Sequence, residues 1–171
     1  MKRFFREARV LSLLHHPNTV RLLDFGVEGD TPFIVMERLH GVTLQSLLRL
    51  QVPLPERFAL HVALRIARTL AEAHKLSILH RDIKPGNIML VPMSEGRIRV
   101  KVLDFGLARF FMPYEGQTVT EVDKFVGTVR YLAPECLVSS RQDARRDLYS
   151  LGIVLYEMLS TYSPLVDLRT R

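Results

Sequence analysis

The stretch from His80 to Asn87 places three side chains suited to phosphoryl transfer on one short predicted loop. Asp82 can accept a proton, Lys84 carries a positive charge, and the amide of Asn87 can bind a metal ion. Because phosphoryl transfer depends mainly on positioning and on charge neutralisation, these residue types in this spacing favour that reaction. The competing interpretation of Asp82 is a turn-forming aspartate before a proline loop.

A second carboxylate, Asp104, follows the strand-like run Ile98–Leu103. That run and the segment Ile88–Val91 flank a turn at Met93–Gly96, which predicts a hairpin. Asn87 and Asp104 would then lie at one edge of this hairpin, where an amide oxygen and a carboxylate can bind a divalent cation together. Taken singly, each residue would by default have a capping or turn role.

Three blocks of the sequence together resemble the signature motifs of the protein-kinase family. They are H-R-D-x-x-x-x-N at 80–87, D-F-G at 104–106 and A-P-E at 133–135. The resemblance implies an α+β, protein-kinase-like fold, with a partial small lobe over residues 1–38 and a partial, mostly helical large lobe over residues 39–171. The sequence around the motifs resembles eukaryotic-like serine/threonine kinases of bacterial type.

This resemblance gives the loop residues specific roles. Asp82 would be the catalytic residue that accepts or orients the proton of a substrate hydroxyl, and Lys84 would steady the transferring phosphate. Asn87 and Asp104 would hold Mg²⁺, a hard cation that prefers oxygen ligands. ATP is the implied phosphate donor, and a hydroxyl of a protein substrate is the implied acceptor. The positions of Lys84 and Thr128 resemble serine/threonine kinases rather than tyrosine kinases.

The implied nucleotide-binding residues lie outside the loop. Glu7 falls where a helix glutamate of the family pairs with a strand lysine that grips the α- and β-phosphates. Taken alone, Glu7 would be a solvated helix charge. Met36 resembles the gatekeeper of the hinge, and backbone groups of Glu37 and Leu39 would contact adenine. Met89 would form the floor under the base.

Regulatory positions are also implied by the resemblance. Arg81, beside the catalytic aspartate, is similar to the arginine of kinases that are regulated by phosphorylation, where it pairs with the added phosphate. Thr118 and Thr120 are the candidate acceptors, with solvated loop threonines as the competing interpretation. Thr128 matches a threonine near the substrate-docking loop. Glu135 matches a glutamate whose arginine partner comes from a later helix of the family, so we expect it to lack that partner here.

Three further residues receive structural roles by the same resemblance. His80 and Phe105 fall where the family stacks a hydrophobic spine between its lobes, together with Leu11 and Leu22. Ordinary core residues would look the same in the sequence. Asp147 matches an aspartate at the start of a central buried helix, where it would accept hydrogen bonds from the catalytic-loop backbone.

The composition is that of an ordinary globular protein. The 171 residues are 47% hydrophobic and 25% charged, and the single cysteine allows no intrachain disulfide. No apolar run reaches the length of about 18 residues that a membrane span needs, and the N-terminus does not resemble a secretory signal. We therefore expect a cytoplasmic protein without membrane contact. Despite the net charge of +6, the arginines are scattered, so we expect no nucleic-acid partner.

Sequence periodicity predicts the remaining elements. They are a helix over 2–14, strands over 20–25 and 33–36 joined by a loop at 26–32, a short helix capped by Thr43, a long helix from Pro55 to about Lys75, and a buried helix over 147–160 whose inner stripe carries Leu148, Leu151, Leu155 and Met158. Residues 107–132 lack periodicity and are expected to form a surface loop.

Two motifs of the family do not occur in these 171 residues, namely the G-x-G-x-x-G loop and the V-A-I-K lysine. We expect the chain to be a fragment, incomplete at both ends, rather than a degenerate remnant, because the catalytic loop is intact. A polypeptide of these residues alone should show weak or no catalysis. The leading hypothesis is a serine/threonine protein kinase. The alternatives are an inactive kinase-like binding or scaffold module, a small-molecule phosphotransferase of kinase-like fold and, last, a nucleic-acid-binding protein.

Overall fold

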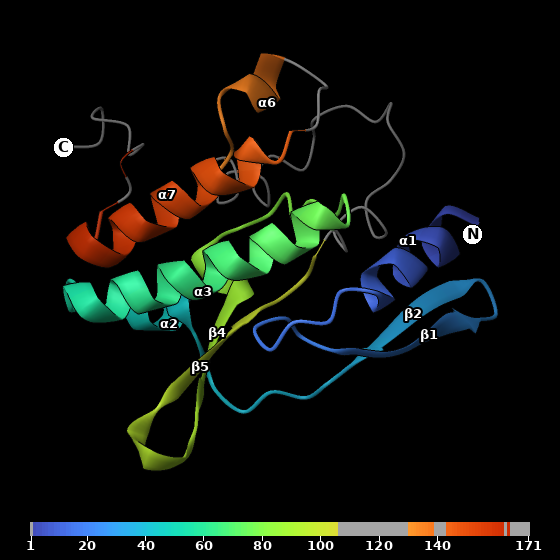
Figure 1. The fold of residues 1–171 in the computed structure, drawn as a ribbon, viewed down its shortest axis with the longest axis horizontal. Helices are drawn as coiled ribbons and strands as arrows, with labels where there is room; N and C mark the ends of the chain where they lie inside the picture. Colours follow the sequence, from blue (N-terminus) through green and yellow to red (C-terminus); the bar gives the residue numbers. More distant parts are fainter. Residues whose placement is uncertain (1, 106–129, 139–142, 163, 165–171) are drawn as a thin grey trace.

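The computed structural model describes residues 2–105, 130–138, 143–162 and 164. A small part with one helix beside a two-stranded sheet adjoins a larger, mostly helical part with a three-stranded sheet (Figure 1). The helices are α1 (Lys2–Ser12), α2 (Leu44–Leu48), α3 (Glu56–Lys75), α6 (Glu135–Val138) and α7 (Arg145–Ser160), with 3-10 turns η1 (Pro85–Asn87) and η2 (Ser94–Gly96). The strands are β1 (Leu22–Glu28), β2 (Thr31–Met36), β3 (Val42–Thr43), β4 (Ile88–Pro92) and β5 (Ile98–Val102).

The small part buries one face of α1 against the β1–β2 sheet. The helical period places Phe4, Ala8, Leu11 and Leu14 on one face; Phe4, Ala8 and Leu14 are buried, and Leu11 is partly buried. The Phe4 ring meets Phe25 of β1 edge to face, with 6.4 Å between ring centroids. Such aromatic pairs add to the free energy gained by burying apolar area. The predicted amphipathic helix is therefore confirmed, although it ends at Ser12.

The hairpin of the small part is longer than the sequence predicts. β1 runs to Glu28 and pairs in antiparallel register with β2 from Thr31, so the turn consists of Gly29 and Asp30 alone. Gly29 has a φ of +59°, which glycine adopts without steric cost. The predicted loop over 26–32 is therefore wrong at both ends. Gly26, which the sequence places in the loop, lies within the strand, opposite Phe33.

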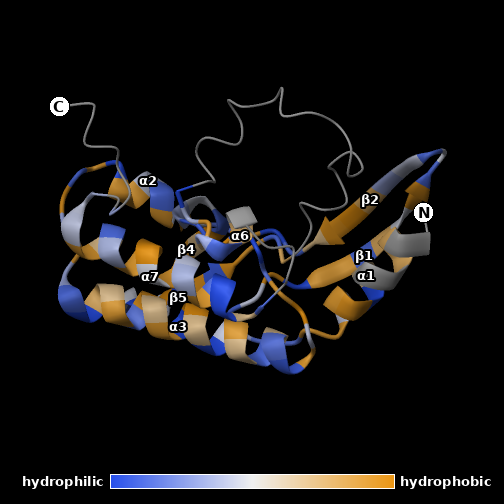
Figure 2. Ribbon diagram, turned by 90° about the horizontal axis from the view of Figure 1, so that it is seen from above, coloured by the Kyte–Doolittle hydropathy of each residue, from blue (hydrophilic) through white to orange (hydrophobic). Residues whose placement is uncertain are grey.

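The hydrophobic core lies between α3, α7 and the β4–β5 hairpin. α3 contributes a continuous buried row from Ala59 to Ala73, and α7 contributes Val154 and Met158. Figure 2 shows apolar residues interleaved with polar ones along both helices, as expected for helices with one buried face. The predicted inner stripe of α7 is partly wrong, because the side chain of Leu148 is 51% exposed. Successive side chains on a helix differ by about 100°, so burying Asp147 turns its neighbour outward.

The C-terminus of α3 aims the chain into the predicted catalytic loop. Ser77 has a φ of +58°, and its N–H donates to the carbonyl of His74. The N–H of Ile78 donates to the carbonyl of Ala73 at 2.9 Å. These two bonds form a Schellman motif, which satisfies carbonyls at the helix end and turns the chain sharply. Ile78 is buried, so the residues that follow enter the core.

The three-stranded sheet lies in the larger part of the molecule and ends beside the predicted catalytic loop. β3, β4 and β5 pair in that order, and the Thr43 hydroxyl accepts from the N–H of Ser46, which confirms the predicted cap of α2. Beyond β5, the N–H of Val102 donates to the carbonyl of Asn18 at 2.7 Å, and that of Val20 donates to the carbonyl of Val102. This pairing joins the segment before β1 to the larger part of the molecule.

Candidate active site

Asp82 lies at the centre of the predicted catalytic loop. The Lys84 ammonium lies 2.7 Å from Oδ2 of Asp82. The Asn87 amide donates to the same oxygen at 2.9 Å and to the Asp82 carbonyl at 2.8 Å. Oδ1 of Asp82 is buried and has no hydrogen-bond partner among the described residues. The structure therefore brings these three predicted residues together and leaves one carboxylate oxygen without a protein donor.

The carboxylate of Asp147, on α7, accepts hydrogen bonds from the backbone of this loop. Its Oδ2 accepts from the N–H of His80 at 2.9 Å, and its Oδ1 accepts from the N–H of Arg81 at 2.8 Å. His74 of α3 lies 2.8 Å from Oδ2. Arg81 has a φ of +69°, an unfavourable conformation for a side chain of its size. Strained backbone of this kind persists where surrounding contacts fix it and is enriched at functional sites.

His80 joins the loop to the end of the β5 strand. One ring nitrogen, Nε2, lies 2.7 Å from the carbonyl of Leu103 and must donate to it. The other, Nδ1, accepts from the N–H of Asp82. This pattern requires the neutral imidazole with its proton on Nε2. Burial lowers the pKa of His80 and outweighs the opposing effect of Asp147. The His80 ring also packs against Phe105, with centroids 4.6 Å apart.

The neutral His80 makes a testable contribution to pH-dependent stability. Because its folded pKa lies below the ordinary value of 6.5, the unfolded chain binds more protons under mildly acidic conditions. The free energy of unfolding should therefore fall as the pH drops below 6.5, by up to about 1.4 kcal/mol per pH unit for this one group. Urea unfolding of the native chain and of His80→Gln at neutral and mildly acidic pH measures this contribution. A shallower pH dependence in the variant is expected, and equal slopes would contradict the assignment.

Asn87 and Asp104 form the second half of the site. Asn87 is buried, and its carbonyl accepts from the N–H of Leu103 at 2.9 Å, which ties the two segments together beside Asp104. Since the Nδ2 of Asn87 donates to Asp82, its Oδ1 is the atom left for a metal ion. Asp104 has a φ of +55°, in the left-handed region that aspartate tolerates better than most residues. An amide oxygen and a carboxylate suit Mg²⁺, which uses few protein ligands together with phosphate oxygens.

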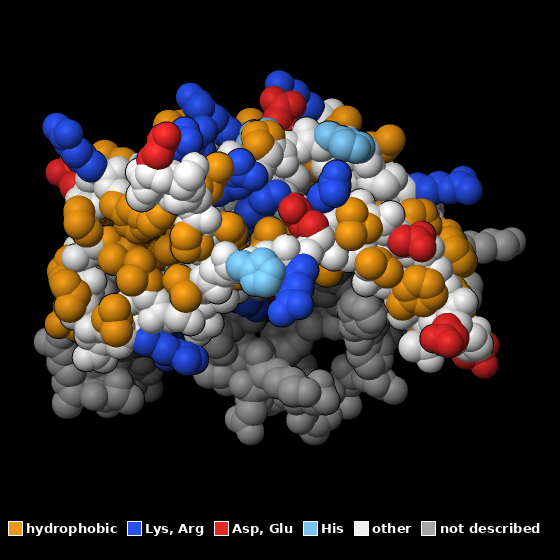
Figure 3. All heavy atoms as spheres, turned by 90° about the horizontal axis from the view of Figure 1, so that it is seen from below, with side chains coloured by type: hydrophobic (Ala, Val, Ile, Leu, Met, Phe, Trp, Pro, Cys, Tyr) orange, Lys and Arg blue, Asp and Glu red, His pale blue; other side chains and the backbone are white. Residues whose placement is uncertain are grey.

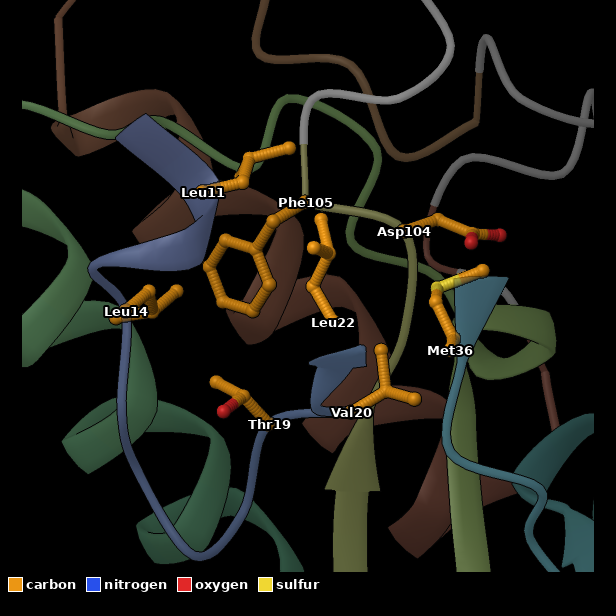
Figure 4. Close-up of a pocket in the computed structure, with 8 residues that line it drawn as sticks. All are labelled: Leu11, Leu14, Thr19, Val20, Leu22, Met36, Asp104 and Phe105. Carbon is orange, nitrogen blue, oxygen red and sulfur yellow. The ribbon is translucent and has the colours of Figure 1, made fainter. Parts of the chain in front are cut away.

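A small cavity of about 30 Å³ lies between the C-terminal end of α1 and Asp104 (Figure 4). Leu11, Leu22 and Phe105 line it, together with Met36 and Asp104. The predicted spine residues are therefore neighbours here, since Phe105 also contacts His80. Met36, the predicted gatekeeper at the end of β2, lines the same cavity as Asp104, a predicted metal ligand. Met89, which is predicted to lie under the adenine base, is on β4 and does not line this cavity.

The hinge glutamate has a side-chain partner that sequence reasoning missed. The ammonium of Lys101, a buried residue of β5, contacts Oε1 of Glu37 at 2.5 Å and donates to the carbonyl of Thr19 at 2.8 Å. Partial burial raises the pKa of Glu37, but Lys101 and the N–H of Arg21 outweigh this and hold it below its usual value. The backbone N–H of Glu37 donates to Arg21, so its carbonyl is the group left for a nucleotide. Leu39 follows, half buried.

Several predicted site residues are not tested by this geometry. Thr118, Thr120 and Thr128 lie outside the described residues. Glu7 lies within α1, but its side chain is likewise outside the described part. Glu135 begins α6 and is exposed, and its carboxylate helps to raise the pKa of Arg145, after the larger effects of Asp143.

The described geometry brings together only part of the three sequence blocks that resemble the protein-kinase signature, at the catalytic loop and beside Asp104. Asp82 is hydrogen-bonded to Asn87 and paired with Lys84, the Asp147 carboxylate of a central helix anchors the loop, and Asp104 follows the strand that is tied to Asn87 through Leu103. The family model described as the protein kinase domain matches residues 1–170. The chain therefore belongs to the protein kinase domain family. Members of this family in general use ATP and Mg²⁺.

Curated relatives are serine/threonine-protein kinases of bacteria. The chain is 40% identical over 163 residues to pkn2 of Myxococcus xanthus, 39% identical over 164 residues to PrkC of Bacillus subtilis, and 40% identical over 166 residues to PknB of Mycobacterium tuberculosis. These alignments cover 95–96% of this chain but only 19%, 24% and 26% of the respective relatives. The chain thus spans about a fifth to a quarter of their length.

Solved structures support the same fold. The kinase domain of Mycobacterium tuberculosis PknI matches with a TM-score of 0.73 and 26% identity, over 96% of this chain and 58% of that one. A structure of Rad53 in complex with AMP-PNP matches with a TM-score of 0.77 and 28% identity, over 99% of this chain and 41% of that one. The predicted α+β, protein-kinase-like fold is confirmed.

None of the helices in the described parts of the chain combines the length and apolar character needed to cross a membrane.

Proposed function

We propose that this chain carries the catalytic loop of a serine/threonine protein kinase, which transfers the γ-phosphate of ATP to hydroxyl groups of a protein substrate. The observation that carries the proposal is the asymmetric environment of the Asp82 carboxylate. Lys84 and Asn87 occupy Oδ2, whereas Oδ1 is buried and accepts no hydrogen bond from the residues that the structure describes. A substrate hydroxyl that donates to Oδ1 would satisfy this atom and be oriented for attack. Proton acceptance of this kind contributes about 10²- to 10⁴-fold to a rate.

The other residues of the site would bind and orient the phosphate donor. Asn87 Oδ1 and the Asp104 carboxylate would hold Mg²⁺, which when bound neutralises charge on the phosphates. Lys84, which is only partly buried, would place its positive charge near the transferring group. The positive charge of Lys84 and the negative charge of Asp82 compensate each other in the absence of substrate, so the site does not bury a lone charge.

The hinge would bind adenine through its backbone, with Met36 as gatekeeper, the Glu37 carbonyl and a backbone group of Leu39 as contacts, and Met89 under the base. The Lys101 contact supports this because it holds the Glu37 side chain away from that role. Glu7 would pair with a lysine that grips the α- and β-phosphates.

The remaining roles are regulatory or organisational. We place the boundary between the lobes near residue 38, after β2. Arg81 would pair with a phosphate added at Thr118 or Thr120, and Thr128 would lie near the substrate. Glu135 would have the structural role of the family glutamate that pairs with an arginine of a later helix. Because ATP is a cytoplasmic phosphate donor, the proposed activity belongs to the cytoplasm, with a protein rather than a nucleic acid as substrate.

The specificity of the proposed reaction can be tested by phosphoamino-acid analysis. The native gene product, incubated with labelled ATP, Mg²⁺ and matched peptides that offer Ser, Thr or Tyr at one position, should label the Ser and Thr peptides. The names of the relatives and the Lys84 position support this choice. Labelling mainly on Tyr would contradict the substrate class, whereas no labelling of any peptide would count against the reaction itself.

A catalytically inactive kinase-like binding module is the second candidate. A polypeptide of these residues alone is expected to have weak or no activity. Turnover by the native gene product that disappears in a folded Asp82→Asn variant would exclude the binding-module hypothesis.

A further inference from the structure

A groove of about 430 Å³ lies between α3 and the β4–β5 hairpin. None of the residues that line it belongs to the candidate active site. Its charged or titratable lining residues are His61, Arg65, Arg97 and Arg99, and no carboxylate lines it within the described parts of the chain. Its apolar lining residues are Pro17, Phe58, Met93, Ile98 and Val100. The groove thus combines positive charge with an apolar surface.

The positive charge of the groove is only weakly compensated. Arg65 and Arg99 form no ion pair with any of the described residues. Arg97 lies 3.4 Å from Glu95, but both side chains are mostly exposed, and such pairs are worth little in water. His61 and Arg65 lie one helical turn apart on α3, so they share a face. Figure 3 views the side on which the hairpin turn projects in Figure 1, and Lys and Arg side chains gather in its upper half.

The groove also contains an open sheet edge. Among the described residues, the segment from Asn18 to Val20 meets only the C-terminal end of β5, through two backbone bonds with Val102 and a bond from the Asn18 side-chain amide to the Val100 carbonyl. Outward-facing backbone groups recur every second residue along a strand. The N–H and C=O of Ile98 therefore face the same way as those of Val100, into the unpaired part of the edge. An extended peptide can add to such an edge by backbone hydrogen bonds.

We propose that this groove binds an acidic, extended segment of a partner protein. The backbone of the segment would continue the β5 edge at Ile98, its carboxylates would face Arg65 and Arg99, and one apolar side chain would pack against Phe58. This inference goes beyond the proposed kinase function, because binding here requires neither nucleotide nor the catalytic loop. The combination of an apolar surface and a strand edge favours a peptide over a nucleic acid, which would need a continuous basic path.

Fluorescence anisotropy with a labelled heptapeptide of Glu and Asp around one central Leu tests the proposal on the native gene product without nucleotide. Saturable binding is expected. Charge reversal in the double variant Arg65→Glu/Arg99→Glu should weaken it at least about tenfold, because attraction is replaced by repulsion. The matched control Arg57→Glu/Arg68→Glu changes the same net charge at exposed positions of α3 outside the groove, and it should weaken binding much less.

Changes in the peptide test the other two features. Replacing the central Leu by Ser and N-methylating the central peptide bond should each reduce affinity, the first through the apolar contact and the second through the strand edge. If the charge-reversal variant does not fold, Arg65→Gln/Arg99→Gln provides the same test with neutral side chains. Equal loss in both double variants, equal binding of a Lys-containing peptide, or tighter binding of a single-stranded oligonucleotide with the same variant sensitivity would overturn the proposal.

Discussion

Asp82→Asn should reduce phosphate transfer by about 10²- to 10⁴-fold while leaving the fold intact. Lys84 and Asn87 both donate to the Oδ2 position, so the amide oxygen of the new side chain must occupy it. The amide nitrogen is then forced into the position of Oδ1, the buried atom that has no partner in the described parts of the chain. A donor would stand where the substrate hydroxyl needs an acceptor. The substitution therefore removes the chemistry without removing the contacts that shape the loop.

Steady-state kinetics with a protein substrate, together with thermal unfolding, checks this expectation. The decrease should appear in kcat rather than in the KM for ATP, because Asp82 would act on the hydroxyl and not on the nucleotide. Asp30→Asn, at the exposed turn of the β1–β2 hairpin, is the matched control and should keep its activity. A variant at 82 that turns over at the native rate would remove Asp82 from the mechanism.

Asp147→Ala should markedly lower the free energy of unfolding. The carboxylate accepts from the backbone N–H groups of His80 and Arg81 and contacts His74, and it is itself buried. Alanine would leave two backbone donors without partners, at a cost of about 1 to 3 kcal/mol for each one that stays buried. The strained backbone at Arg81 would also lose its support.

The melting temperature and urea unfolding of Asp147→Ala measure this loss. Glu72→Ala, which removes an exposed carboxylate paired with Lys75 on α3, is the control and should leave the melting temperature nearly unchanged. Asp147→Asn should also be destabilised, because the N–H groups of His80 and Arg81 bond to different oxygens of the carboxylate, and the NH₂ group of asparagine would place a donor against one of them. An unchanged melting temperature in the alanine variant would show that the loop does not depend on this anchor.

The contacts of the catalytic loop could be anticipated because they are encoded locally. Asp82, Lys84 and Asn87 lie within six residues, so the loop alone brings them together. The role of Asp147 was available only through resemblance, since nothing in its own segment reveals that it bonds to residues 66 and 67 positions earlier. The same dependence on distant partners explains why the predicted stripe on α7 is wrong at Leu148, whose neighbour Asp147 is the buried residue.

Lys101 is the clearest feature that the sequence did not reveal. A lysine in a short strand of alternating character is normally taken as a solvent-facing residue. Here its partners, Glu37 and the carbonyl of Thr19, lie 64 and 82 residues away in the chain. The one available signal was its place in a strand with buried valines on both sides, Val100 and Val102, which indicates a strand covered on more than one face.

We propose that the Asp82 loop and Asp104 form one magnesium-dependent phosphotransfer site. The most direct test of this proposal is transfer of labelled γ-phosphate from ATP to a protein substrate by the native gene product, measured across a Mg²⁺ titration for the native sequence and for Asp104→Asn. We predict Mg²⁺-dependent labelling that falls about 10²-fold or more in Asp104→Asn, while Asp30→Asn retains it. Equal labelling by Asp104→Asn, with the same Mg²⁺ requirement as the native sequence, would contradict the account.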